Sequence, residues 1–296
     1  MKRARLLSLL LTLGCDPNIV DAVREPMPLG SGAGATSGGS SSSAEGGSGD
    51  VGAGGDEGGG GDAPSPLAVS LLHRYSFDGE GDVALDPRGT ADGKVVGTTL
   101  GGDGTLPLAG AKTGQFLNLP NRIVSGLIDA TFESWLTWHG GSAWQRIFDF
   151  GSNSAGEDAQ GSTGVSYLFF TAFSPADTGR QLPAGMRLVY SQNGVEDEEV
   201  CTTPSKLPAD VPVHVAVVID SRARTMSIYQ DGALQAECAL SRPLSAIDDV
   251  NNWLGHSNYE ADVDLSAVYD EFRIYGAPLT GEQLAASFAA GPNATP

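Results

Sequence analysis

The sequence predicts an all-β fold, a two-sheet antiparallel sandwich with one short C-terminal helix, preceded by a disordered Gly/Ser-rich tether. Three observations lead to this prediction. After Leu67, short apolar runs alternate with Gly, Pro, Asn and Asp about every ten residues, a spacing typical of sandwiches and barrels. The candidate strands are too many for one open sheet. Only residues 278–288 combine helical spacing of apolar residues with a capping sequence.

The first 15 residues have the outline of an export signal. A basic start is followed by a Leu-rich apolar run that ends at Gly14 and Cys15. The cysteine at the cleavage point resembles a bacterial lipoprotein signal, in which Cys15 is lipidated and begins the mature chain. Thr12 and Leu13 depart from the Leu and small residue that such signals prefer, so an ordinary signal peptide stays as the alternative.

Residues 16–66 form the expected tether. Between Gly30 and Gly61, 15 of 32 residues are Gly, interleaved with Ser, Asp and Glu. No apolar set there repays the entropy of ordering. We therefore expect a lipoprotein-type signal at 1–15, a disordered linker at 16–66 and one folded domain at 67–291. The domain is expected at the cell surface or outer membrane, or otherwise secreted or periplasmic.

The charge balance excludes several classes of protein. The 296 residues carry 17 basic and 36 acidic side chains, a formal charge of −19. This acidic excess offers no basic stripe for phosphates, so nucleic acid and anionic lipid are not expected partners. No apolar run reaches the ~20 residues that span a bilayer, so membrane contact is expected only through a lipid anchor.

Cys201 and Cys238 remain once Cys15 is assigned to the signal. Each lies in a strand-like run, at 199–202 and 234–239, with one apparent hairpin between them. In an exported protein such a pair predicts a disulfide, here expected between neighbours in a sheet. Metal binding by these two cysteines is disfavoured because no His lies nearby in sequence.

Eleven apolar runs are candidate strands. The run at 213–219 is apolar at nearly every position, as in the middle of a sheet. Asp231 and Gly232 separate two apolar runs and suit a type I′ turn, which predicts a hairpin. The candidate strands are residues 72–77, 116–119, 130–138, 145–150, 165–173, 186–190, 213–220, 225–230, 234–239, 252–254 and 267–275.

The predicted helix follows Pro278. Thr280 and Gln283 have the spacing of a capping box. Leu284 and Phe288 stand four residues apart and form an apolar stripe to dock on the sandwich. Gly291 and the proline after it end the helix.

Five segments also occur in a recognisable order. They are 130–137 (ATFESWLT), the Asp231-Gly232 hairpin, 252–257 (NWLGHS), 269–275 (YDEFRIY) and 279–284 (LTGEQL). Together they resemble the laminin-G-like jelly roll of the concanavalin A-like lectin and glucanase superfamily, over roughly residues 71–290. The resemblance implies a jelly-roll sandwich, often a structural calcium ion, and roles in carbohydrate binding, adhesion or support of a catalytic domain. Fold alone does not choose among these roles.

By this resemblance, Asp78 and Asp270 are expected to be side-chain ligands of a structural calcium ion, completed by nearby carbonyls. Calcium prefers carboxylate and carbonyl oxygens. Asp78 follows the first predicted strand and Asp270 lies in the last, and these strands are usually neighbours in a jelly roll. The alternative is that Asp78 only accepts from backbone amides in its own turn.

Carbohydrate recognition needs flat aromatic faces beside hydrogen-bonding side chains. Trp138, Trp144, Trp253 and Tyr259 are candidates because Gly, Asn or His lies near each, and the last three are assigned to ligand binding. Core packing is the competing use, and Trp144 is expected to be the most exposed of the three. The polar loops 151–163 and 193–199 would form the rim of the site.

A glycoside hydrolase would need two carboxylates converging in a cleft. Residues 260–264 (EADVD) resemble the Glu-x-Asp-x-Glu pattern of glucanases, which presents alternate residues on one face of a strand. Asp264 replaces the last Glu, so we favour a solvated acidic loop that contains Glu260, Asp262 and Asp264. No catalytic residue is assigned.

The sequence thus predicts an exported, surface-tethered, non-catalytic module that binds a glycan or another extracellular ligand. A structural or protein-adhesion module without a sugar site is the alternative. A glycoside hydrolase is the third possibility. Calcium is the only cofactor expected.

Overall fold

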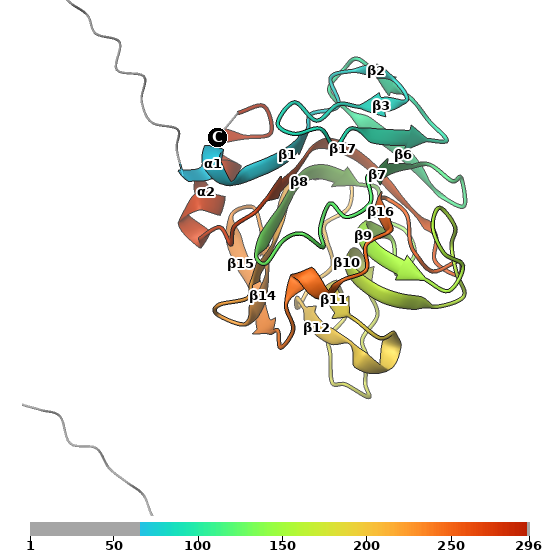
Figure 1. The fold of residues 1–296 in the computed structure, drawn as a ribbon, viewed down its shortest axis with the longest axis vertical. Helices are drawn as coiled ribbons and strands as arrows, with labels where there is room; N and C mark the ends of the chain where they lie inside the picture. The colour runs from blue at the N-terminus through green and yellow to red at the C-terminus, as the bar shows by residue number, and fades with distance from the viewer. Residues whose placement is uncertain (1–65, 295–296) are drawn as a thin grey trace, which may run out of the picture. The chain divides into compact units, whose positions relative to one another are not determined.

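The computed structural model describes residues 66–294 (Figure 1). The predicted signal, Cys15 and nearly all of the predicted linker lie outside the described residues. No helix in the described range is long and apolar enough to cross a membrane.

Two antiparallel sheets form a sandwich, as the sequence predicts. The seven-stranded sheet has the order β1 (Leu71–Tyr75), β17 (Asp264–Tyr275), β8 (Ala130–Trp138), β13 (Pro212–Asp220), β14 (Thr225–Gln230) and β15 (Ala233–Ala239), and β6 (Leu106–Ala111) also pairs with β17. The eight-stranded sheet has the order β12 (Glu199–Thr202), β11 (Gly185–Ser191), β10 (Gly164–Ser174), β9 (Arg146–Asn153), β16 (Asn251–Leu254), β7 (Phe116–Leu119), β4 (Gly93–Val96) and β3 (Val83–Ala84).

Short elements complete the fold. They are β2 (Glu80–Gly81) with β5 (Leu100–Gly101), the helices α1 (Pro66–Ser70) and α2 (Gly281–Ala290), and the 3-10 helices η1 (Val195–Asp197) and η2 (Leu244–Ala246).

The main core lies between the two sheets and contains many aromatic rings. Phe132 of β8 contacts Phe148 and Phe150 of β9, with ring centroids 5.2 and 5.4 Å apart. Phe272 of β17 meets the same two rings from the seven-stranded sheet. These contacts join the inner faces of the two sheets and bury large apolar areas.

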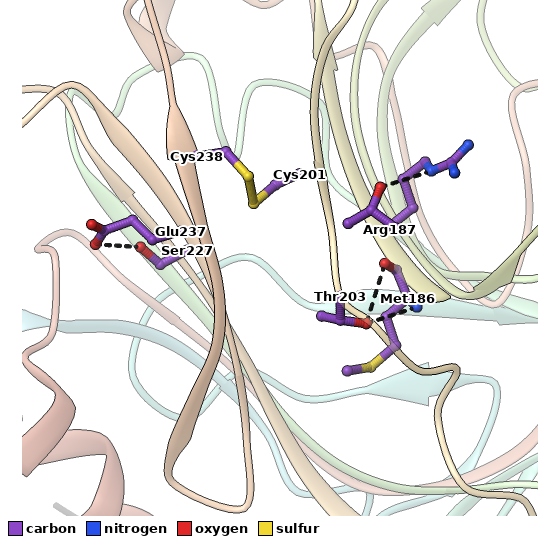
Figure 2. The surroundings of a disulfide bond; sticks show 8 residues. Met186, Arg187, Cys201, Thr203, Ser227, Glu237 and Cys238 are labelled. Atoms are coloured by element: carbon purple, nitrogen blue, oxygen red, sulfur yellow. Dashed lines mark hydrogen bonds between the residues drawn. A yellow bond between two sulfur atoms is a disulfide. The ribbon is translucent and has the colours of Figure 1, made fainter. Parts of the chain in front are cut away.

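Cys201 and Cys238 form the predicted disulfide, with their Cα atoms 5.4 Å apart (Figure 2). Their placement differs from the prediction, because they are not neighbours in one sheet. Cys201 lies on β12, an edge strand of the eight-stranded sheet, and Cys238 lies on β15, an edge strand of the seven-stranded sheet. The bond therefore joins the two sheets at one side of the sandwich.

Helix α2 begins as predicted. The Thr280 hydroxyl accepts from the Gln283 backbone N, and the Gln283 side chain accepts from the Thr280 backbone N. Leu284 is buried in a cluster with Leu71 and Tyr275 of the neighbouring sheet. Phe288 is still 41% exposed, so the apolar stripe docks mainly through Leu284.

The strands β4 and β6 were not among the predicted ones. Pro107 and Gly110 interrupt the apolar pattern of β6, yet β6 lies at an edge and pairs only with β17. An edge strand tolerates a proline that cannot donate to a ladder. In β4, only two of four residues are apolar aliphatics, which is too short a run to detect.

Candidate functional site

The outer face of the eight-stranded sheet, the face turned away from the main core, carries a second apolar cluster. Along β10, Leu168 and Phe170 belong to the main core, whereas Tyr167 and Phe169 belong to the outer cluster. This is the alternation that a strand imposes. The outer cluster also contains Val189, with Trp144, Val200 and Tyr259 packed against it.

A bulge in β9 brings Arg146 and Asp149 to this outer face. Phe170 of β10 lies opposite Phe148, but the next residue, Thr171, lies opposite Arg146. One extra residue on β9 explains this shift. Residues three apart in a regular strand point to opposite faces, whereas here the Arg146 Nε donates to the Asp149 Oδ2 at 3.3 Å.

Asp149 also fixes the loop 255–263 over the outer face. Its carboxylate accepts from the backbone N and the Nδ2 of Asn258, both at 2.9 Å, and from the Ser257 hydroxyl at 3.4 Å. Burial raises the pKa of Asp149, and Arg146 and the Asn258 donors oppose that rise. This anchored loop contributes Tyr259 and Asp262 to the site.

A cavity of about 490 Å³ opens beside the loop. The rings of Trp144, Phe169 and Tyr259 line it, together with charged side chains. Two ion pairs lie in its wall, each with a nitrogen-to-oxygen distance of 2.7 Å, between Arg146 and Asp262 and between Arg180 and Glu198. Arg187 also lines the cavity. The site thus combines aromatic surface with fixed polar groups, as small-molecule sites do.

Trp144 is held in an unusual backbone conformation. Its φ is +68°, a left-handed value that costs free energy for a bulky residue and tends to persist at functional sites. Its N–H donates to the Phe173 carbonyl at 2.9 Å. The guanidinium carbons of Arg146 and Arg187 lie 5.7 and 5.4 Å from the Trp144 ring centroid. The structure thus places Trp144 half-buried at the cavity.

Tyr259 also lies at the cavity. Its ring meets Tyr167 edge-on, with centroids 5.8 Å apart. The Tyr167 hydroxyl donates to Glu198 at 2.8 Å, which connects the aromatic cluster to the Arg180–Glu198 pair. The structure therefore brings together Trp144 and Tyr259, two of the three predicted ligand-binding residues.

The prediction for Trp253 is wrong. Trp253 is only 1% exposed, so it presents no face to a ligand. Its ring packs against His256 and Phe116, with centroid distances of 4.8 and 5.7 Å. Trp253 lies opposite Asp149 in the pairing of β16 with β9, where the loop that Asp149 anchors covers it.

The acidic run 260–264 is not a uniformly solvated loop. Of its three acids, only Glu260 is exposed. Asp264 is buried and interacts with His256 at 2.6 Å and with the Gly114 backbone N at 2.8 Å. Asp262 faces the cavity and is paired with Arg146. The prediction fails because a local run of acids gives no information about distant cationic partners.

Asp78 and Asp270 lie on neighbouring segments. β1 pairs with β17, and the rings of Phe77 and Tyr269, the residues that precede the two acids, are 6.4 Å apart. Asp78 is exposed and Asp270 is half-buried. Burial raises the pKa of Asp270. Within residues 66–294, no group of three or more His, Cys, Asp or Glu side chains has the arrangement of a metal site.

The cavity residues missed from the sequence include Arg146, Phe169 and Arg187. A signal existed for the two arginines, because each interrupts an apolar strand in an acidic domain. A charged residue in such a place must find a partner or a function. For Phe169 no signal existed, because Phe170 beside it is equally apolar.

A family model described as the concanavalin A-like lectin/glucanases superfamily matches residues 111–285. No curated protein matches the sequence.

Several solved structures share the fold. Domain 4 of AbnA, a GH43 extracellular arabinanase from Geobacillus stearothermophilus, in complex with arabinotriose, has a TM-score of 0.57 and 18% identity over 73% of this chain and 97% of that domain. Trypanosoma rangeli sialidase has a TM-score of 0.53 and 16% identity over 75% of this chain. The match spans 33% of the sialidase.

The binding domain of botulinum neurotoxin DC, in complex with rat synaptotagmin II, has a TM-score of 0.54 and 12% identity over 76% of this chain and 52% of that one. At such identities these likenesses establish the fold and nothing further.

Proposed function

Because the chain belongs to the concanavalin A-like lectin/glucanases superfamily, we propose that it is an exported, non-catalytic module that binds a glycan in the cavity on the outer face of the eight-stranded sheet. The observation that carries this proposal is the cavity itself. Trp144, Phe169 and Tyr259 surround it beside the pairs Arg146–Asp262 and Arg180–Glu198.

Such a site suits sugar chemistry. A sugar ring has apolar C–H faces and a polar rim of hydroxyl groups, so it needs aromatic surface and hydrogen-bonding groups together. Trp144 and Tyr259 would provide the surface, and the carboxylates of Asp262 and Glu198 would accept from hydroxyls. Because Arg146 and Arg180 already hold these carboxylates, little side-chain entropy is lost on binding.

The fold neighbours support this choice without deciding it. The arabinanase domain is in complex with arabinotriose, which favours a glycan. The neurotoxin domain is in complex with a protein, which keeps the protein-adhesion alternative. A binding assay with isolated oligosaccharides separates the two proposals, because only the glycan-binding proposal predicts that they bind.

A non-catalytic role is part of the proposal. Asp262 is paired with Arg146, and Asp264 is engaged by His256 away from the cavity lining. A retaining hydrolase needs two carboxylates about 5–5.5 Å apart on either side of the scissile bond. Loss of turnover on a polysaccharide in an Asp262→Asn variant would instead favour the hydrolase.

The proposed location follows from the sequence. Lipidation of Cys15 would anchor the chain to a membrane, and residues 16–66 would act as a tether that presents the domain to extracellular ligands. Metabolic labelling with a radioactive fatty acid tests this. Label on the wild type and none on a Cys15→Ser variant is expected, whereas an unlabelled wild type would leave only an ordinary export signal.

A structural calcium ion is also proposed, with Asp78 and Asp270 as side-chain ligands. The fit rests on Asp270, whose carboxylate makes no hydrogen bond or ion pair with any described side chain although it is half-buried. Asp78 lies close to Gly104, because a Cβ placed on Gly104 would be 3.1 Å from the Asp78 Oδ1. Gly104 comes just before strand β6, which pairs with β17 up to Tyr269, the residue before Asp270. A calcium ion would neutralise both acids.

An array of glycans and polysaccharides, applied to the purified protein, tests the central proposal. We expect selective binding that a Trp144→Ala variant loses. A Leu234→Ala variant is the matched control, because Leu234 is 51% exposed on β15 and outside the cavity lining. Uniform absence of binding would overturn the glycan proposal in favour of a protein partner.

A further inference from the structure

Arg187 is a buried cation without a carboxylate partner. It is only 4% exposed. Its Nε donates to the Thr202 hydroxyl at 3.0 Å, and its Nη2 donates to the carbonyls of Pro175 and Pro183 at 3.0 and 3.3 Å. All three acceptors are neutral. Arg187 forms no ion pair with any residue in the described range.

The other two arginines of the cavity are neutralised. Arg146 is paired with Asp149 and Asp262, and Arg180 with Asp177 and Glu198. After Leu72 the chain has 28 acidic and 13 basic residues, so acidic partners are plentiful. A buried charge without a counter-charge is costly. The absence of a contacting carboxylate at Arg187 therefore needs an explanation.

The free part of the guanidinium is directed to the cavity. The Nη1 of Arg187 has no hydrogen-bond acceptor among the described residues and is not sealed from solvent, and Arg187 lines the cavity. In Figure 2 the Arg187 side chain points away from the disulfide. Its guanidinium carbon lies 5.4 Å from the Trp144 ring centroid, so one ligand can touch both.

We infer that the cavity takes a glycan that carries a carboxylate, on a hexuronic or sialic acid unit, and that this carboxylate binds Arg187 while the sugar ring lies against Trp144. The inference rests on the proposed glycan-binding function and names the class of glycan. Hydrogen bonds between two charged groups are shorter and stronger than neutral ones. The ligand would supply the contacting carboxylate that Arg187 does not find among the described residues.

The acids in the cavity do not prevent this. Glu198 accepts from Arg180 and from the Tyr167 hydroxyl, and Asp262 accepts from Arg146. The third acid of the cavity, Asp177, is paired with Arg180. Asp177 and Glu198 act on Arg187 through space, but each carboxylate is paired with another arginine and none contacts Arg187. Burial lowers the pKa of Arg187, but a guanidinium remains a cation at neutral pH.

Matched pairs of oligosaccharides test the inference on the purified protein by calorimetry. The pairs are tetragalacturonic acid with its methyl ester, and 3′-sialyllactose with lactose. We expect the acidic member of at least one pair to bind at least tenfold more tightly. Arg187→Gln should remove this preference, so that the acidic and neutral members bind with equal affinity. Arg222→Gln, at an exposed arginine outside the cavity lining, should leave both unchanged.

The failures are distinguishable. Equal affinity for the acidic and neutral members in the wild type would overturn the inference and leave the glycan proposal intact. If neither pair of oligosaccharides binds and the glycan array also shows no binding, both the inference and the glycan proposal are overturned. Thermal melts of Arg187→Gln show whether the variant folds, and the comparison within the wild type needs no variant.

Discussion

The buried carboxylate of Asp149 accepts two hydrogen bonds from Asn258, one from its backbone N and one from its Nδ2, each at 2.9 Å. These bonds connect strand β9 to a loop more than 100 residues later. Because the same loop carries Tyr259 and Asp262, Asp149 positions part of the cavity wall without lining it.

An Asp149→Asn substitution should therefore weaken both stability and ligand binding. The amide keeps the shape but presents one acceptor fewer and removes one of the two carboxylates paired with Arg146. We expect the free energy of unfolding to fall by about 3 kcal/mol, as for a broken buried pair, measured by urea denaturation. The exposed pair His139–Asp210 provides the control, since Asp210→Asn should change the free energy of unfolding by less than about 0.5 kcal/mol. Equal effects of the two substitutions would contradict this role.

Loss of the disulfide should destabilise the sandwich. Cys201 and Cys238 are 37 residues apart, and closing a loop of that length contributes about 4 kcal/mol in the chain-entropy model. Replacing both cysteines by alanine should lower the free energy of unfolding by about that amount, and a reductant should lower it equally in the wild type. If the double variant were as stable as the oxidised protein, the bond would not hold the two sheets together.

Acid should destabilise the protein in part through Asp86. Burial by itself raises the pKa of Asp86, but the contact with His73 at 2.7 Å and the backbone N–H of Arg74 outweigh it, so the native pKa is lowered. The unfolded value is about 3.9. Below that value the unfolded state binds more protons, so the contribution of Asp86 is present above about pH 4 and is lost as the pH falls through the native pKa.

An Asp86→Asn variant should accordingly be less stable at pH 7 and lose less stability on acidification. Urea midpoints measured between pH 7 and pH 2.5 show how steeply the stability of the wild type and of the variant falls with pH. Parallel slopes for wild type and variant would show that Asp86 is not a source of the acid sensitivity.

Calcium should raise the melting temperature if Asp78 and Asp270 hold the ion. Binding to the folded state alone adds about 2.7 kcal/mol when the free ion is at a hundred times its Kd, so a shift of several degrees between calcium and chelator is expected. Asp270→Asn should abolish the shift, while Asp248→Asn, at an exposed acid elsewhere, should keep it. Identical melting temperatures in calcium and chelator would rule the ion out.

The sandwich was predictable because its signals are local. Asp231 and Gly232 mark the hairpin of β14 and β15, and Thr280 with Gln283 marks the start of α2. Each signal depends on a few adjacent residues. β6 escaped detection because Pro107 is acceptable only at an edge, and whether a strand lies at an edge depends on the whole topology.

The site was less predictable because it depends on distant contacts. Trp144 and Tyr259 were identified as aromatics beside polar residues, and so was Trp253, which the loop from β16 buries. Nothing near Trp253 in the sequence distinguishes it, since its ring packs against Phe116, which lies more than a hundred residues earlier, as well as against His256. Arg146 reaches the cavity because of the bulge in β9, which no residue pattern in the sequence predicts.

The most direct test of the glycan-binding cavity is an NMR titration of the four tryptophan indole N–H signals with the strongest ligand from the glycan array. Trp135, Trp138 and Trp253 are buried and lie outside the cavity lining, whereas Trp144 lines the cavity. We predict that the Trp144 signal shifts in a saturable way and that the other three change little. A bound glycan that leaves the Trp144 signal unmoved would contradict the assignment of the cavity as the binding site.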